Sequence, residues 1–218
     1  SLAPVLFFMA ACWSPPPSPT SNVHSAKDTP ARLLIVSGPA GSGKTTVCEN
    51  LLRVESHLER VITATTRPPR GNEQDGVDYH FLSSADFEAK VATGDFYEHA
   101  RVHGNYYGTL KQVVQDKLRA GINLLLNIDV QGAASFRATA EDDALLAGRL
   151  TTVFIMPPGL EALKERLEGR ATDSEAEVQR RLEVAKDEIL EAGNYDHILH
   201  SSTREADPAA LQAIYRKP

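Results

Sequence analysis

The chain has 218 residues, of which 42% are hydrophobic and 24% are charged, and its formal net charge is −6. This composition is that of a globular protein rather than a disordered one, and the acidic balance argues against nucleic acid as its main partner. The two cysteines, Cys12 and Cys48, form neither a disulfide framework nor a metal-ligand cluster, so we expect a protein of the reducing cytoplasm.

The first 30 residues differ from the rest of the chain. Residues 1–13 form an apolar run that is too short to cross a bilayer as a helix and lacks the positive charge that begins a secretory signal. Residues 14–30 are rich in Pro and Ser. We therefore expect residues 1–30 to be a disordered N-terminal extension, residues 31–218 to form one domain, and no membrane to be involved.

Short apolar runs alternate with helical segments from residue 31 onward. The pattern predicts strands at 32–37, 61–64, 79–82, 122–128, 151–155 and 197–200, and a strand–turn–strand unit over 96–107. It predicts helices at 44–54, 84–93, 111–120, 160–167, 176–192 and 208–215. Because alternating strands and helices build parallel sheets covered on both faces, we expect an α/β fold of three layers with a mainly parallel sheet.

Residues 38–45 read GPAGSGKT and match G-x-x-x-x-G-K-[ST] at every fixed position, between a predicted strand and a predicted helix. Glycines allow successive backbone N–H groups to curl around phosphate oxygens, and the helix N-terminus adds its positive dipole. Such a loop binds a nucleoside triphosphate, with Lys44 on its β- and γ-phosphates and Thr45 on Mg²⁺. The predicted binding residues are Gly38, Pro39, Ala40, Gly41, Ser42, Gly43, Lys44, Thr45 and Thr46.

Three further stretches resemble the guanylate kinases, a family of P-loop nucleoside monophosphate kinases. Residues 63–73 (TATTRPPRGNE) resemble that family's T-T-R-x-P-R-x-G-E stretch, which residues 75–81 continue. Residues 98–100 and 104–109 (GNYYGT) resemble its E-x-A and G-N-x-Y-G-[ST] elements, and residues 128–132 (IDVQG) resemble its I-D-x-Q-G. The resemblance runs from about residue 32 to residue 215. It implies a cytoplasmic enzyme that transfers the γ-phosphoryl group of ATP to GMP, with Mg²⁺ as cofactor.

The resemblance also implies how the domain is divided. The P-loop NTPase core would comprise residues 31–62, 122–165 and 182–218, a small β-rich insertion at about 63–110 would bind GMP, and residues 166–181 would form a helical lid. The partners would be ATP and GMP, and the protein could be a monomer or a homodimer.

Two arginines, Arg67 and Arg70, lie three residues apart in a loop stiffened by prolines. Such a pair can hold a monoester phosphate through bidentate contacts. In the family that this chain resembles, the residues at these positions hold the GMP phosphate, and those matching Tyr79 and Tyr107 add phenolic donors. We expect the same of these four residues.

Guanine presents an N–H and an NH₂ group on one edge, and a carboxylate accepts from both, whereas adenine offers no such pair. Glu98 matches the family's carboxylate for this role, with Thr63 and Thr109 beside the base. The family usually has an acid where this chain has Asn127, which leaves that contact with guanine open. Asp129, at the end of the predicted strand 122–128, is expected to face Mg²⁺, directly or through water. The predicted GMP-binding residues are Thr63, Arg67, Arg70, Tyr79, Glu98, Tyr107, Thr109, Asn127 and Asp129.

Three arginines, Arg166, Arg170 and Arg181, frame a polar segment at 171–177 (ATDSEAE) that suggests a lid. The resemblance implies that Arg170 and Arg181 close over the phosphates with Arg166 nearby. Alternatively, these arginines pair with exposed acids on the same helices, namely Glu165, Glu168 and Glu183. The predicted catalytic residues are Lys44, Arg70, Arg170 and Arg181.

Other functions and contacts remain open at this point. Ser201-Ser202 replaces an Asn-Asp pair that the family usually has near the adenine of ATP. A guanylate-kinase-like module that binds partner proteins without catalysis is one alternative, although such modules typically lose the glycines and lysine that residues 38–45 retain. A kinase of the same fold for another phosphate acceptor is the second, and Glu98 with Thr63 and Thr109 favours guanine over it.

Overall fold

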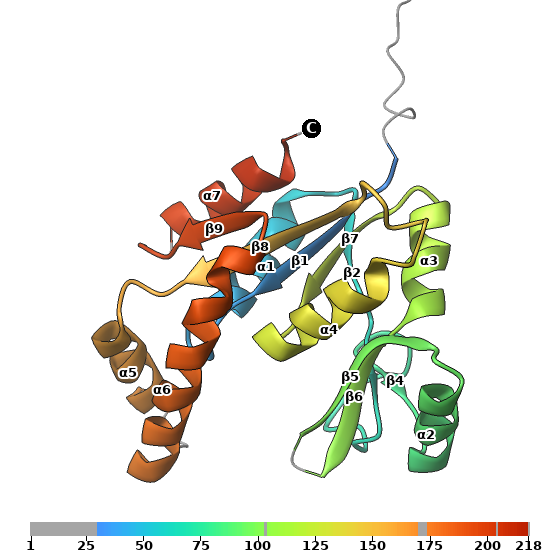
Figure 1. Ribbon diagram of the computed structural model, residues 1–218, viewed down its shortest axis with the longest axis horizontal. Helices are drawn as coiled ribbons and strands as arrows, with labels where there is room; N and C mark the ends of the chain where they lie inside the picture. The colour runs from blue at the N-terminus through green and yellow to red at the C-terminus, as the bar shows by residue number, and fades with distance from the viewer. Residues whose placement is uncertain (1–29, 103, 170–173, 204, 218) are drawn as a thin grey trace, which may run out of the picture.

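The computed structural model describes residues 30–217 apart from residues 103, 170–173 and 204, so residues 1–29 of the predicted extension lie outside it. Its main sheet has five parallel strands with helices on both faces (Figure 1), which confirms the predicted α/β class. The strand order is β2 (Leu58–Arg60), β7 (Asn123–Asn127), β1 (Leu33–Ser37), β8 (Leu150–Met156) and β9 (His197–His200).

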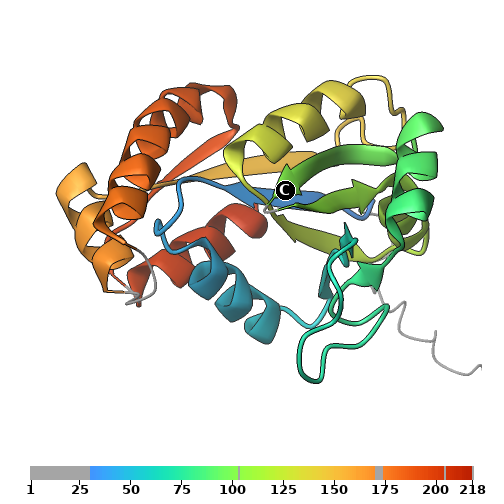
Figure 2. The same cartoon turned by 90° about the horizontal axis from the view of Figure 1, so that it is seen from below.

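Strand β1 lies at the centre of this sheet, and its alternating side chains supply two separate cores. Leu33 and Ile35 pack with α3 (Lys111–Arg119) and α4 (Val130–Ala140) on one face. Leu34 and Val36 pack with α1 (Lys44–Val54) and α7 (Ala206–Tyr215) on the other. Figure 2 shows the sheet between these two helical layers. The buried run that predicted this strand is thus explained by burial on both faces.

A second sheet of four strands follows the order β4-β3-β6-β5 and forms the predicted β-rich insertion. Strand β3 pairs parallel with β4 and antiparallel with β6, and β6 pairs antiparallel with β5. Helix α2 (Ser84–Ala92) covers this sheet, where the Phe87 ring stacks on Phe96 with 4.4 Å between centroids. The strands are β3 (Ala64–Thr65), β4 (His80–Phe81), β5 (Phe96–Val102) and β6 (Asn105–Leu110).

A bulge in β5 joins the two sheets. Phe96 pairs with Leu110 and Glu98 pairs with Thr109, which leaves Tyr97 as the extra residue. The Tyr97 ring packs against Phe136 of α4 with 4.4 Å between centroids, and its hydroxyl donates to Asp143. Phe96 meanwhile packs in the small core beside Phe87. Consecutive residues of one strand therefore serve both cores.

The helix predicted at 44–54 and the strand predicted at 197–200 have those bounds in the structure, and most other predicted elements differ by a few residues at their ends. The strand predicted at 61–64 is wrong. Its place in the main sheet is taken by β2, three residues earlier, while Ala64 belongs to β3 because it pairs with Gly108 and His80.

Helix α4 was not predicted at all. Its sequence, VQGAASFRATA, is rich in small residues and includes Gly132 in its first turn, so it gives only a weak apolar stripe. The helix forms because Ala133, Phe136 and Ala140 are buried against the main sheet. The remaining helices are α5 (Leu160–Glu168), α6 (Glu175–Leu190) and a 3₁₀ turn at Glu191–Asn194. None of the helices in the described residues is long and apolar enough to cross a membrane.

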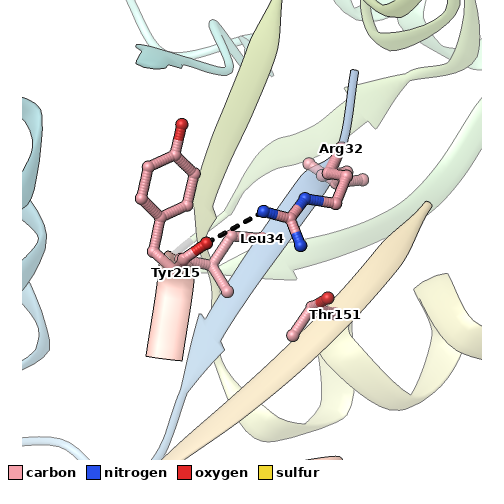
Figure 3. A pocket seen from close by; sticks show the side chains of 5 residues that line it. Arg32, Leu34, Thr151 and Tyr215 are labelled. Atoms are coloured by element: carbon pink, nitrogen blue, oxygen red, sulfur yellow. Dashed lines mark hydrogen bonds between the residues drawn. The ribbon is translucent and has the colours of Figure 1, made fainter. Parts of the chain in front are cut away.

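Arg32, just before β1, connects the two ends of the described chain (Figure 3). Its guanidinium donates to the carbonyl oxygens of Tyr215 at 3.0 Å and Lys217 at 2.5 Å, at the C-terminal end of α7. A cation at this end of a helix satisfies carbonyls that lack helical partners and complements the helix dipole. The adjacent pocket between Arg32, Leu34, Thr151 and Tyr215 measures about 10 Å³, which is room for about one water molecule.

We therefore expect Arg32→Ala to lower the free energy of unfolding by about 1 kcal/mol, because two carbonyl oxygens lose their donors. Urea denaturation measures this change. Arg119→Ala is the control, since it removes an exposed ion pair with Asp116 within α3 and is expected to cost less than about 0.5 kcal/mol. Equal effects of the two substitutions would contradict the capping role of Arg32.

Candidate active site

The loop at residues 38–45 leaves the carboxyl end of β1 and runs into α1. Gly38 has a φ of 141°, and a Cβ atom there would lie 2.6 Å from the carbonyl oxygen of Ile155 in β8. Gly41 and Gly43 have φ values of 86° and 100°, in the left-handed region that favours glycine. The glycines of the motif are thus required both by the backbone curl and by the close approach of β8.

Lys44 folds back over this loop. Its Nζ donates to the carbonyl oxygens of Gly38 at 2.5 Å and Pro39 at 2.8 Å. Thr45 and Thr46 are exposed in the first turn of α1. A cavity of about 190 Å³ is lined by Ala40, Gly41, Gly43, Lys44, Thr45 and Thr46. Three further residues of the loop were also predicted to bind the nucleotide but are buried, namely Gly38, Pro39 and Ser42.

A second cavity, of about 390 Å³, adjoins the first and shares Gly41, Gly43 and Thr46 with it. The rest of its lining is Val47, Arg166, Gly169, Ser201, Thr203 and Asp207. Sequence reasoning missed Asp207, which is 6% exposed and accepts hydrogen bonds from both serines at 201 and 202. The spacing of five to six residues between this acid and the serines was the only signal for it.

The small sheet brings three of the predicted acceptor-site residues together. Arg67 is 7% exposed, and its guanidinium carbon lies 5.4 Å from the ring centroid of Tyr79. The rings of Tyr79 and Tyr107 meet edge to face with 6.3 Å between centroids. Hydrogen bonding with Glu73, and to a lesser extent with Tyr107, raises the pKa of Arg67 above its usual value against the opposing effect of burial. Arg67 is therefore firmly cationic.

Arg70 takes a different position from its predicted partner Arg67. Its side chain is exposed, while its backbone N–H donates to Glu73 Oε2 at 2.7 Å. Glu73 also binds Arg67 through both carboxylate oxygens, each at 2.9 Å. Sequence reasoning placed Glu73 in the motif but gave it no role, because spacing alone does not show that the loop turns back on itself.

Glu98 lies just after the bulge in β5 and is 9% exposed. Its Oε1 accepts a hydrogen bond from the hydroxyl of the fully buried Thr109 at 2.6 Å. Burial raises the pKa of Glu98 above its usual value, and the Asp129 carboxylate adds to the rise, while the hydrogen bond from Thr109 opposes it. Burial thus outweighs the hydrogen bonds from Thr109 that favour the ionised form of this carboxyl. Thr63, the other predicted hydroxyl, is half-buried just ahead of β3.

Asp129 does not end strand β7 as predicted but caps the N-terminus of α4. Its Oδ1 accepts from the backbone N–H of Gly132 at 2.7 Å. A Cβ atom on Gly132 would lie 3.1 Å from this oxygen and 3.4 Å from Glu98 Oε2, so the two carboxylates flank the same glycine. Asn127, at the end of β7, is exposed. The base-side residues are thus gathered between β7, α4 and the small sheet.

The arginines predicted to belong to a lid have different partners. Arg166 of α5 points back to the loop, with Nη1 3.5 Å from the carbonyl oxygen of Gly41. Arg181 of α6 pairs with Glu177 at 3.0 Å, and Glu177 was not among the predicted partners. Two of the predicted partners bind lysines instead, Glu168 with Lys164 and Glu183 with Lys186. Arg170 lies outside the described residues.

Helix α6 carries one further carboxyl near the site that sequence reasoning missed. Glu188 lies seven residues after Arg181, so both occupy the same face of the helix. Burial raises the pKa of Glu188 to about 7, with Lys44 opposing and Asp129 adding to the rise. Glu188 also lines a cavity of about 460 Å³ between α4 and α6. The heptad spacing from Arg181 was a signal that could have identified it.

Comparison with known proteins agrees with this geometry. The family model described as Guanylate kinase matches residues 30–217. The chain is 44% identical over 184 residues to the guanylate kinase of Dechloromonas aromatica, covering 84% of this chain and 88% of that protein. It is 41% identical over 198 residues to that of Anaeromyxobacter dehalogenans, covering 90% and 85% of the two chains.

A solved structure extends the comparison to three dimensions. The crystal structure of guanylate kinase from Anaplasma phagocytophilum superimposes with a TM-score of 0.62 and 30% sequence identity, covering 85% of each chain. The match of the family model spans the described part of the chain, including the phosphate-binding loop, the small sheet and helices α5 and α6. The chain belongs to the guanylate kinase family.

Proposed function

We propose that this protein transfers the γ-phosphoryl group of ATP to GMP, giving ADP and GDP. The observation that carries the proposal is the pairing of the buried Glu98 carboxylate with Thr109 in the same small sheet that holds Arg67. A carboxylate for a base and a guanidinium for a phosphate are the two groups that a purine monophosphate requires. The phosphate-binding loop of the main sheet supplies the donor side.

Guanine suits the Glu98 carboxylate for an electrostatic reason. Thr109 hydrogen bonds the carboxylate through its hydroxyl and its backbone, and the remaining lone pairs can accept from the N–H and NH₂ groups of guanine. Two such bonds stabilise the ionised carboxylate that burial disfavours in the free protein. Adenine has no matching pair of donors, which disfavours AMP as the acceptor. In this proposal Thr63 and Asn127 lie at the margin of the base site.

The ATP phosphates would lie in the cavity of about 190 Å³ over α1, and the nucleoside in the adjoining cavity of about 390 Å³. Lys44 would exchange the carbonyl oxygens of Gly38 and Pro39 for phosphate oxygens. The backbone N–H groups at the start of α1 would complete the anion site. Asp207, with its two serines, would border the nucleoside.

The residues at the loop also fit Mg²⁺. The described residues contain no group of three His, Cys, Asp or Glu side chains able to hold a metal ion, which suits an ion bound largely through phosphate oxygens and water. The exposed Thr45 hydroxyl is a hard oxygen donor within the cavity, and Asp129 would act directly or through water. When bound, Mg²⁺ neutralises charge on the phosphate oxygens.

Transfer then depends on positioning and charge neutralisation, without a dedicated base. A GMP phosphate oxygen attacks the γ-phosphorus in line while Lys44 and Arg70, together with the lid residues Arg170 and Arg181, neutralise charge. In this division residues 63–110 bind GMP, residues 166–181 form the lid that excludes water, and the remainder binds ATP. The reaction consumes ATP, so we place it in the cytoplasm. One chain supplies both sites, whether the protein is a monomer or a homodimer.

Replacing the loop lysine tests the donor side. We expect Lys44→Ala to lower kcat by at least about 100-fold, because the cation on the β- and γ-phosphates is lost as charge develops. A coupled assay of ADP formation with GMP as acceptor measures this loss. Lys90→Ala, which alters an exposed lysine of α2 paired with Asp95, is the control and should leave turnover unchanged. Near-normal turnover of Lys44→Ala would refute the mechanism.

Replacing the base-site carboxylate tests the acceptor side. We expect Glu98→Gln to raise the KM for GMP by roughly 100-fold and to narrow the preference for GMP over AMP, because an amide offers one acceptor and one donor to two guanine donors. Steady-state kinetics with GMP, dGMP, AMP, UMP and dTMP measure both effects. Glu88→Gln is the matched control, because Glu88 is an exposed carboxylate of α2 that binds Tyr106 at 3.2 Å. If the preference for GMP survives Glu98→Gln, another residue selects guanine.

A further inference from the structure

Glu73 holds Arg67 more completely than an ordinary surface ion pair does. Its two oxygens accept from Nη1 and Nη2, each at 2.9 Å, in a bidentate geometry. The Arg67 and Glu73 side chains are 8% and 25% exposed. The carbonyl oxygen of Pro68 accepts a further bond from Arg67 Nη1 at 2.7 Å. The guanidinium therefore has little freedom to rotate.

These contacts leave a defined edge of Arg67 for a ligand. A guanidinium has five N–H donors in a fixed plane. Glu73 engages one donor on each terminal nitrogen, and Pro68 engages the second donor of Nη1. The other two donors, on Nε and Nη2, lie on the same edge of the plane, and the Tyr107 hydroxyl is a further hydrogen-bond partner of the guanidinium. That edge has the spacing that binds two oxygens of a phosphate group.

Aromatic rings hold the plane of this guanidinium. Its central carbon lies 5.4 Å from the ring centroid of Tyr79 and 5.9 Å from that of Phe81. Tyr107, which hydrogen bonds with Arg67 and contributes to its raised pKa, packs against Tyr79. The rings limit tilting of the plane and Glu73 limits rotation within it.

We propose that Glu73 is a positioning residue for the acceptor site, which turns the Nε–Nη2 edge of Arg67 toward the phosphate of the bound nucleotide. The same carboxylate accepts a hydrogen bond from the backbone N–H of Arg70 at 2.7 Å, so it also fixes the backbone position of the second arginine. This role rests on the proposed function, because the phosphate concerned is that of GMP.

Positioning and simple electrostatics make opposite predictions here. Glu73 brings a negative charge to a site for an anion, so its charge by itself weakens phosphate binding. If charge were decisive, Glu73→Gln would tighten the binding of GMP. If orientation is decisive, the substitution loosens it, because the amide cannot accept from both terminal nitrogens and Arg67 is free to turn.

We expect Glu73→Gln to weaken GMP binding by roughly 10- to 100-fold, because a misplaced phosphate clamp loses its geometry. Calorimetric titration with GMP and with guanosine measures this effect without turnover. Guanosine affinity and the KM for ATP should remain unchanged, since neither involves the acceptor phosphate. Glu73→Asp, which keeps the charge on a shorter side chain, should bind GMP with intermediate affinity.

A matched control separates orientation of Arg67 from general order in the loop. Asp75 is an acid of the same loop whose Oδ1 accepts from the backbone N–H of Phe81 at 2.8 Å. We expect Asp75→Asn to leave GMP affinity unchanged. In an Arg67→Ala background, Glu73→Gln should have a much smaller effect on GMP affinity than in the native protein, because only the contact with the Arg70 backbone is then altered.

Unchanged or tighter GMP binding by Glu73→Gln would overturn the role of Glu73, as would equal losses for GMP and guanosine or an additive loss in the Arg67→Ala background. These outcomes differ from a failure of the proposed function. In that case the unmodified protein would neither bind GMP nor form GDP from it.

Discussion

Parallel pairing of the five-stranded sheet is the constraint on which the site depends. It brings the carboxyl ends of the strands to the same edge, and three of them lead directly into site residues. The phosphate-binding loop follows β1, Asp129 follows β7, and Ser201 follows β9. Because each strand must be reached by a crossing helix, groups distant in sequence arrive at one place. The close approach of Gly38 to β8 fixes the loop at this edge.

The bulge at Tyr97 sets the position of Glu98, the carboxylate that we propose for the acceptor nucleotide. It turns one residue of β5 into the main core, where Tyr97 meets Phe136, and directs the next residue, Glu98, toward the N-terminus of α4. In a regular strand, the side chains of consecutive residues point to opposite faces of the same sheet. The extra residue instead ties the small sheet to the large one.

The cations that we propose to contact phosphate have acceptors within the protein. Lys44 binds carbonyl oxygens of its own loop, and Arg181 binds Glu177. Binding of phosphate at these positions is an exchange of partners, so its net gain is smaller than the gross strength of the new bonds. Arg67 differs, because Glu73 and Pro68 together bind three of its five N–H donors and hold the guanidinium in one orientation. In the proposed function Arg67 is a preorganised contact, whereas Lys44 and Arg181 would exchange their present partners for phosphate oxygens.

The sequence by itself determined the α/β class and the phosphate-binding loop with α1, because these depend on local patterns and contiguous motifs, and the same motifs supplied the residues that we propose for the acceptor. Tertiary structure decided what depends on contacts between distant segments. Helix α4 forms through burial rather than propensity, Ala64 joins the second sheet through Gly108, and Asp129 becomes a helix cap. Likewise Asp207 and Glu73 gained roles only when the chain folded back on the serines and on Arg67. No spacing rule encodes such contacts, since their energy comes from groups that meet only in the folded state.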